Sequence, residues 1–331
     1  MKNEDNLIFA NKVNLASPKA GAKIVDVSDE FFAKADRMLS DKDPIFVVDK
    51  YDNNGKWMDG WESRRKRVEG NDWVVIQLGG NCSIDDIIVD TSHFTGNYPP
   101  YASLDYSCKT SYKEGEMNWR PLLEKQELTG DFVNEFSALK NDIVNFVRLN
   151  IFPDGGVARL RLLGDLTPQN LENGKEVELS SLLNGGKIIG YNNAHYGDVN
   201  ALLSEGRGKT MGDGWETRRR RVPGHDYIII ELGTPGFISK IEIDTCHFKG
   251  NYPDRASLQT INLQSDNKNQ NRFDLSESWE FILEEKKCSA DNIHTFGNDS
   301  LMHQNQVSHV RLNIYPDGGI SRLRVYGTVA D

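Results

Sequence analysis

Cysteine is scarce in this sequence, with four among 331 residues. The four lie far apart, form no CxxC pair and have no histidine at the spacing of a zinc site. The sequence therefore indicates neither a disulfide framework nor a structural metal site, and reduced thiols are expected. The cysteines are Cys82, Cys108, Cys246 and Cys288.

Long apolar runs are also missing, and no secretory leader is expected. The longest apolar runs, such as Trp73–Ile76 and Ile228–Ile230, are far shorter than the ~20 residues that cross a bilayer. Two acidic residues, Glu4 and Asp5, lie close after Lys2, and no apolar segment comes after them as it would in a signal peptide. We therefore expect a cytoplasmic protein that does not associate with membranes.

Positive charge is in deficit, because 39 Lys and Arg face 49 Asp and Glu and give a formal net charge of −10. This balance opposes a broad phosphate-binding surface, so we expect no nucleic-acid partner despite the basic runs Arg64–Arg67 and Arg218–Arg221. Apolar residues are 38% and charged residues 27% of the chain, which is typical of a rather polar globular protein.

The sequence repeats itself. Residues 59–79 (DGWESRRKRVEGNDWVVIQLG) and 213–233 (DGWETRRRRVPGHDYIIIELG) are identical at 13 of 21 positions. At the same offset of 154 residues, IIVDTSHFTGNYPPYASL from Ile87 matches IEIDTCHFKGNYPDRASL from Ile241. A third block, VRLNIFPDGGVARLRLLG from Val147, recurs as VRLNIYPDGGISRLRVYG from Val310 at an offset of 163. The second copy is therefore nine residues longer between these blocks.

The repeat divides the chain into two domains of about 150 residues each, a size typical of single domains and too long for a solenoid repeat. We expect the first domain at residues 13–164 and the second at 177–327. The polar segment 165–176 is expected to link them.

Short strand patterns bounded by Gly, Pro, Asn and Asp dominate each copy. About seven or eight strands per copy predict an all-β protein of two tandem jelly-roll-type antiparallel sandwiches. Val147–Ile151 and Ala158–Leu162 alternate with period two around Pro153–Gly156, which predicts a hairpin. One short helix per copy is expected, at 29–39 after the cap Ser28 and, more weakly, at 195–203.

In the predicted hairpin, Arg148 would face Arg161 and Asn150 would face Arg159. Facing guanidinium groups require a negative partner. That partner is either a carboxylate within the protein or the carboxylate of a substrate held in bidentate fashion, and the residues leave both open. The internal candidates are Asp59, Glu62, Asp72 and Asp90.

Asp90 and His93 come where a strand enters a Gly-Asn loop, and Asp244 and His247 repeat the arrangement. A carboxylate beside an imidazole can transfer protons near neutral pH, although a loop histidine that only packs or hydrogen-bonds is the alternative. The tryptophans of the two DGWE motifs, Trp61 and Trp215, are expected in the core.

Taken together, MDGWESRR and GDGWETRRRR, the IDTxHFxGNYP loop and the [FY]PDGG[IV]xRLR segment, each present twice, resemble the allantoicase family. The resemblance extends from about residue 13 to 327. It implies a repeated jelly-roll fold and the hydrolysis of allantoate to ureidoglycolate and urea, in the breakdown of purines through allantoin.

Allantoate carries a carboxylate and two ureido groups, so its site needs cations, amide-type hydrogen bonding and a proton-transfer group. The duplicated polar residues offer these, in both copies. The catalytic candidates are Glu62, Asp90, His93, Glu216, Asp244 and His247, and the substrate-binding candidates are Arg64, Asn97, Arg148, Arg159, Arg218, Asn251, Arg311 and Arg322.

No cofactor is assigned, a divalent metal is left open, and a homo-oligomer is expected.

The alternative function is a non-catalytic tandem sandwich that binds carbohydrate. The duplicated positions are charged residues and histidine rather than a row of aromatic rings, which disfavours this alternative.

Overall fold

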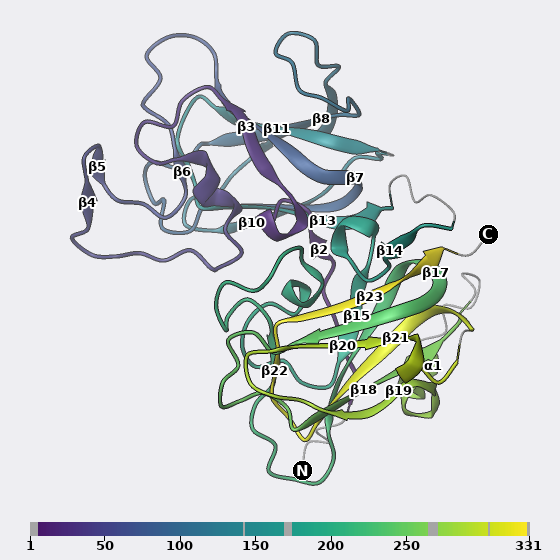
Figure 1. Cartoon of the computed structure of the whole chain (residues 1–331). Coiled ribbons are helices and arrows are strands. Elements are labelled where there is room, and N and C mark those ends of the chain that lie inside the picture. Colours follow the sequence, from purple (N-terminus) through teal and green to yellow (C-terminus); the bar gives the residue numbers. More distant parts are fainter. Residues whose placement is uncertain (1–5, 142, 169–173, 264–270, 304, 330–331) are drawn as a thin grey trace. The chain divides into compact units, whose positions relative to one another are not determined.

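The computed structural model describes residues 6–141, 143–168, 174–263, 271–303 and 305–329. The chain forms two compact units. The N-terminal unit is Lys12–Thr167, and the C-terminal unit is Pro168–Asp331 together with Met1–Asn11 (Figure 1). Each unit is an antiparallel β-structure, so the prediction of an all-β protein with tandem sandwich domains is confirmed. Within the described ranges, no helix is long and apolar enough to cross a membrane.

One long, bent strand organises the N-terminal unit. β7 (Asp72–Asp90) pairs through its first half with β3 and β11 and through its second half with β10 and β13. Its partners change between Gln77 and Asn81, a stretch that contains Gly79 and Gly80. The single strand therefore belongs to both layers of the sandwich. The strands of this unit are β2 (Val13–Asn14), β3 (Lys23–Val27), β4 (Tyr51–Asp52), β5 (Gly55–Lys56), β6 (Trp61–Glu62), β7 (Asp72–Asp90), β8 (Tyr101–Ser107), β9 (Arg120–Glu127), β10 (Val133–Ser137), β11 (Val144–Phe152), β12 (Gly156–Val157) and β13 (Arg159–Thr167).

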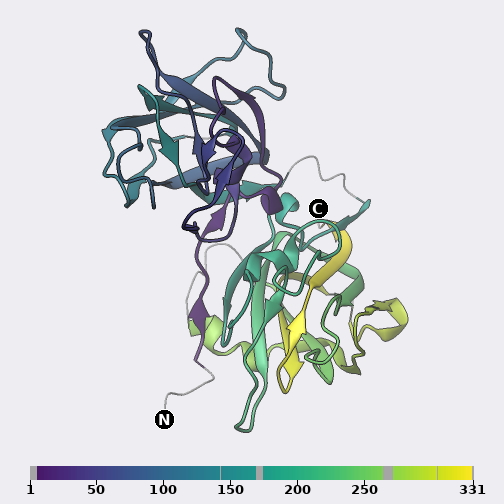
Figure 2. The same cartoon turned by 90° about the vertical axis from the view of Figure 1, so that its left-hand side faces the viewer.

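The C-terminal unit, coloured mostly teal to yellow in Figure 2, repeats this plan around β17 (Asp226–Asp244). β17 pairs with β15, β20, β21 and β23. It also recruits β1 from the beginning of the chain onto the edge strand β15. Its strands are β1 (Ile8–Phe9), β14 (Glu176–Glu178), β15 (Lys187–Tyr191), β16 (Trp215–Glu216), β17 (Asp226–Asp244), β18 (Arg255–Ile261), β19 (Glu280–Lys287), β20 (Ile293–Gly297), β21 (Gln306–Tyr315), β22 (Gly319–Ile320) and β23 (Arg322–Val329).

The predicted hairpin at residues 147–162 is wrong. β11 and β13 pair with different halves of β7, so Arg148 lies opposite Val75 and Arg161 lies opposite Ile88. The segment between them joins the two layers. Both ends of β7 hold that segment, because the N–H of Asp72 donates to the carbonyl of Pro153 and the carbonyl of Asp90 accepts from Ala158.

The predicted α-helices at 29–39 and 195–203 are also wrong, since only their last parts form 3₁₀ helices. Ser28 does not cap a helix: its hydroxyl donates to Asp72 and accepts from the N–H of Trp73. These long-range contacts fix the chain in a non-helical path. The helical segments are η1 (Pro18–Ala20), η2 (Ala35–Leu39), η3 (Leu182–Asn184), η4 (Val199–Leu203), α1 (Asn271–Asp274), η5 (Ser276–Ser278) and η6 (Asn298–Ser300).

The core confirms the expectation for the DGWE tryptophans, because Trp61 and Trp215 are completely buried. A buried ion pair lies in the same region of each unit. Arg159 is 1% exposed and its guanidinium is 2.7 Å from Asp59, while Arg322 is 3% exposed and 3.1 Å from Asp213. The alternative of an internal carboxylate partner is therefore correct for Arg159, with Asp59 as that partner.

Removing one side of this buried pair leaves an uncompensated charge in the interior. We expect Asp59→Ala to lower the free energy of unfolding by about 3 kcal/mol, and Asp213→Ala to do the same in the C-terminal unit. Urea denaturation measures both. Glu116→Ala removes the exposed ion pair with Lys113 and serves as the control, with an expected change below about 1 kcal/mol. An equal, small effect of all three substitutions would contradict a structural role for the buried pair.

Candidate functional site

Three duplicated motifs meet at one place in the N-terminal unit. β6 of the DGWE motif pairs with β12 of the PDGG motif, which sets Glu62 opposite Gly156. The N–H of Gly156 donates to the carbonyl of Asn97, in the GNYP loop, at 2.7 Å. A Cβ atom on Gly156 would lie 1.9 Å from the ring of Phe94, so only glycine permits this approach.

Glu62 is the carboxyl group at this junction. The amide of Asn97 donates to its Oε1 at 2.8 Å. Burial raises the pKa of Glu62, and the hydrogen bond from Asn97 offsets only part of that rise. The side chain is therefore oriented, and it holds a proton more readily than an exposed glutamate does. These are the properties of a group that exchanges protons with a bound molecule.

The same junction exists in the C-terminal unit. β16 pairs with β22, and the amide of Asn251 donates to Glu216 Oε1 at 2.5 Å. The N–H of Gly319 donates to the carbonyl of Asn251 at 2.8 Å. The structure thus brings a catalytic candidate and a substrate-binding candidate into contact in each copy, Glu62 with Asn97 and Glu216 with Asn251.

A basic cleft of about 550 Å³ begins two residues after Glu62. It is lined by Arg64–Val68, Ser28, Phe32 and two acidic residues. The acidic residues each neutralise one cation: Asp29 is 2.6 Å from Arg64, and Asp72 is 2.6 Å from Lys66. Burial would raise the pKa of Asp29, but the hydrogen bonds from Arg64 and from the backbone outweigh it and lower that pKa.

Two cations of the cleft remain available. Arg65 and Arg67 are exposed, and no ion pair joins either of them to another residue in the described ranges. The backbone of the run is fixed, because the N–H of Lys66 donates to Asp154 of the PDGG motif at 2.7 Å. The cleft therefore presents two uncompensated guanidinium groups on an anchored loop, which suits a small anion.

The basic run of the C-terminal unit is anchored in the same way but differs in one partner. The N–H of Arg220 donates to Asp317, and its guanidinium is 3.0 Å from the buried Asp226. Asn193 takes the place of Asp29, and its side chain accepts from the N–H of Arg218. The C-terminal unit thus lacks the carboxylate that holds Arg64 in the N-terminal one.

The predicted proton-transfer pair of Asp90 and His93 does not form. Asp90 accepts from the N–H of Ser92, while His93 Nε2 is 3.2 Å from the carbonyl of Pro44. His93 has a φ of 70°, and its N–H donates to Asp131. The alternative of a hydrogen-bonded loop histidine is therefore the one that the structure supports.

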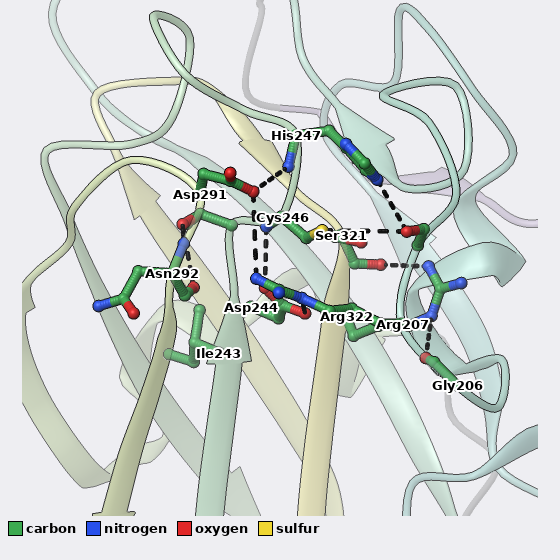
Figure 3. Close-up of polar contacts among 12 residues, drawn as sticks. Gly206, Arg207, Ile243, Asp244, Cys246, His247, Asp291, Asn292, Ser321 and Arg322 are labelled. Atoms are coloured by element: carbon green, nitrogen blue, oxygen red, sulfur yellow. Dashed lines mark hydrogen bonds and ion pairs between the residues drawn. The ribbon is translucent and has the colours of Figure 1, made fainter.

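In the C-terminal unit, Asp244 likewise makes no hydrogen bond to His247 (Figure 3). Asp244 accepts from the N–H of Cys246, and Arg207 Nε is 3.2 Å from its Oδ2. His247 Nε2 lies 2.8 Å from the carbonyl of Gly208.

Arg159 and Arg322 are corrected from substrate-binding to structural residues. Besides its pair with Asp59, Arg159 donates to the carbonyls of Lys42 and Asp59, and Arg322 donates to those of Gly206 and Asp213. Buried guanidinium groups with these partners cannot reach a molecule in the cleft.

Arg148 and Arg311 lie on the sheet face, apart from the Glu62 and Glu216 junctions. Arg148 is 2.8 Å from Asp105 and stacks over Trp119, beside a hollow of about 300 Å³. Arg311 is buried, donates to Asn313 and lies 3.9 Å from the centre of the Tyr227 ring. Burial lowers the pKa of Arg311.

Sequence reasoning missed several residues of this region. Asp29 was interpreted as part of a helix N-terminus, and only the fold shows that it pairs with Arg64. The Cys-His dipeptide at Cys246 gave no recognised metal spacing, because its third neighbour, Asp291, is far away in the sequence. The RRKR and RRRR runs did carry a signal, since their position just before a strand in both copies favours a structural or a site role over nucleic-acid binding.

Comparisons with known proteins agree with the duplicated motifs. The model of the allantoicase repeat matches residues 13–167 and 177–330. A probable allantoicase of Acinetobacter baumannii (strain ACICU) is 46% identical over 323 residues, which are 98% of this chain and 96% of that protein. A probable allantoicase of Rhizobium meliloti (strain 1021) is 45% identical, covering 96% of this chain and 94% of that protein.

The fold agrees as well. The crystal structure of Saccharomyces cerevisiae allantoicase has a TM-score of 0.80 and 32% identity, and the match covers 96% of this chain and 93% of that one. A second allantoicase structure has a TM-score of 0.81 and 32% identity, covering 95% of this chain and 93% of that one. The chain therefore belongs to the allantoicase family.

Proposed function

We propose that this chain hydrolyses allantoate to ureidoglycolate and urea, and that the junction of Glu62 and Asn97 with the adjoining basic cleft is a site of that reaction. Family membership makes the chain a hydrolase acting on C–N bonds in linear amidines. Two observations carry the assignment of the site. The Glu62 carboxyl is half-buried and oriented, and the basic cleft that follows it in the sequence has two exposed arginines without ion-pair partners in the described ranges.

The basic cleft matches the charge of the substrate. Allantoate is a small anion, and Arg65 and Arg67 can hold its carboxylate by paired N–H···O hydrogen bonds. Holding that end fixes the central carbon, to which both ureido groups are attached. The ureido groups then need hydrogen-bonding partners at the junction, where backbone groups and the amide of Asn97 lie.

Glu62 supplies the proton in this proposal. It donates a proton to the nitrogen of the leaving ureido group, so that neutral urea departs. The lone pair of the remaining ureido nitrogen stabilises the positive charge that develops on the central carbon. The resulting carboxylate accepts a proton from water as the water oxygen bonds to that carbon, which forms ureidoglycolate and restores the acid. Asn97 is a positioning residue, because it holds Oε1 of Glu62.

The carbohydrate-binding alternative is less supported. The cleft is lined mainly by Arg, Lys and Asp, with Phe32 as its aromatic ring, rather than by a flat row of rings. A cytoplasmic location is a further part of the proposal, on the sequence arguments given above, and a homo-oligomeric assembly stays an expectation.

The activity has a direct test. The purified chain is expected to release urea from allantoate and to be inert on allantoin and arginine, as measured by a coupled urea assay. Absence of urea release from folded protein, with and without added divalent metal, would end the enzyme interpretation.

Glu62→Gln keeps the acceptor for Asn97 but removes the proton. We expect kcat to fall by about 10²–10⁴. In the unchanged protein, activity is expected to fall as the pH rises through the pKa of Glu62, which lies above 4.5, and this limb of the kcat/KM profile should vanish in the variant. A decline toward low pH instead would make Glu62 a base. Glu216→Gln is the matched variant for the C-terminal copy.

The same substitution is expected to stabilise the fold. A carboxyl whose pKa is raised by folding contributes stability at low pH, and this contribution is lost as the pH rises through the raised pKa. Glu62→Gln should therefore raise Tm at neutral pH, with the gain disappearing below pH 4.5. A loss of both Tm and activity at neutral pH would indicate a structural glutamate.

Arg65→Ala and Arg67→Ala test the anchor. Each is expected to raise KM tenfold or more, because a charged hydrogen bond contributes about 1.5–3 kcal/mol. Lys substitutions should restore binding only in part, since an ammonium group cannot form the paired geometry. Arg120→Ala, exposed on β9 outside the cleft, is the control. Equal KM values in all three Ala variants would remove the cleft from the proposal.

A further inference from the structure

We propose that the C-terminal unit binds a divalent metal of the zinc class through Cys246, His247 and Asp291. A ligand atom from each residue, a sulfur, a ring nitrogen and a carboxylate oxygen, lies within 4.8 Å of the other two. Cys246 and His247 follow the end of β17, and Asp291 lies in the turn between β19 and β20 (Figure 3). The inference does not depend on the proposed reaction.

The histidine is already in the tautomer that a metal requires. A carbonyl oxygen only accepts hydrogen bonds, so the 2.8 Å contact between His247 Nε2 and the carbonyl of Gly208 places the proton on Nε2. The other nitrogen, Nδ1, then carries a lone pair. Histidine ligands of metals commonly donate their second ring N–H to a backbone carbonyl, which orients the ring.

The distances between the ligand atoms are within reach of those in a zinc site. With metal–ligand bonds of 2.0–2.3 Å, the ligand atoms of a tetrahedral site are about 3.3–3.6 Å apart. Side-chain rotations that move the ligand atoms by about 1 Å therefore bring them to these distances. Asp291 is exposed, and its Oδ1 accepts from the N–H of His247, whereas Cys246 is only 4% exposed and stays in place. The fourth position is left for water.

The charged groups around Cys246 and Asp291 are compatible with a bound divalent ion. Two cations, Lys249 and Arg207, act on Asp291 and favour its charged carboxylate form. Arg207 Nε pairs with Asp244 at 3.2 Å, while its Nη2 is 4.0 Å from Asp291. With Arg207 balanced by Asp244, the thiolate and the Asp291 carboxylate together neutralise a divalent ion. Binding transfers the thiol proton to water, as ligation by cysteine requires.

The site is particular to one copy. In the N-terminal unit, His93 and Asp131 have the same contacts as His247 and Asp291, with Pro44 in place of Gly208. Ser92 occupies the position of Cys246, and its hydroxyl is a poor ligand for zinc. The unit that lacks the thiol therefore provides an internal reference for a fold without this site.

The full chain, stripped with a chelator, is to be titrated with Co²⁺, which reports sulfur ligation by a thiolate-to-metal charge-transfer band. We expect the band at one equivalent, its loss when Zn²⁺ is added, and a rise of Tm with Zn²⁺. Cys246→Ser, which installs the residue of the other copy, should abolish the band and the rise in Tm while the far-ultraviolet circular dichroism stays unchanged.

Two further variants complete the experiment. Cys108→Ser removes an exposed cysteine elsewhere and should leave the band intact. Asp291→Asn keeps the acceptor for the N–H of His247 and should weaken Co²⁺ binding tenfold or more. A wild-type chain without the band, a band that survives Cys246→Ser, or one lost with Cys108→Ser would overturn the proposal.

Discussion

Each unit depends on one strand that belongs to both layers of its sandwich. Because β7 bends between Gln77 and Asn81, its two ends return to the same end of the sandwich, where Asp72 and Asp90 hold the PDGG segment from both sides. That segment is then able to receive β6 and to place Gly156 opposite Glu62. The polar junction is thus a consequence of how a single strand crosses the core, and the C-terminal unit reproduces it through β17.

The sequence was sufficient for the class of fold but not for its strand pairing. The duplicated blocks and the period-two alternation predict two all-β domains, because both signals are local. Alternation does not identify the partner of a strand. It predicts one hairpin for residues 147–151 and 158–162, whereas in the structure each of these strands pairs with a different half of β7. The predicted helix at 29–39 failed for a related reason, since Ser28 and Asp29 bond to residues more than thirty positions away.

Part of the candidate site follows from the duplicated motifs. Glu62 with Asn97 and Glu216 with Asn251 come from motifs that recur in both copies, and the structure brings each pair into contact. The sequence does not distinguish structural from substrate-binding arginines. Arg64, Arg148 and Arg159 all lie in duplicated motifs, and they differ only in their burial and in their partners. In the folded chain, Arg159 lies in the core, Arg148 lies on the sheet face and Arg64 lines the cleft.

The two copies differ mainly outside this shared framework. On the sheet face, Arg148 is 30% exposed beside a hollow, whereas Arg311 is buried and lies over the Tyr227 ring. At the loops, Asn193 replaces Asp29 and Cys246 replaces Ser92, each without disturbing the backbone hydrogen bonds around it. A substitution at such a position changes charge or ligand chemistry while the bent strand, the buried tryptophan and the buried ion pair continue to hold the fold. The duplication therefore allows one copy to acquire new polar chemistry without loss of the scaffold that positions the carboxyl group.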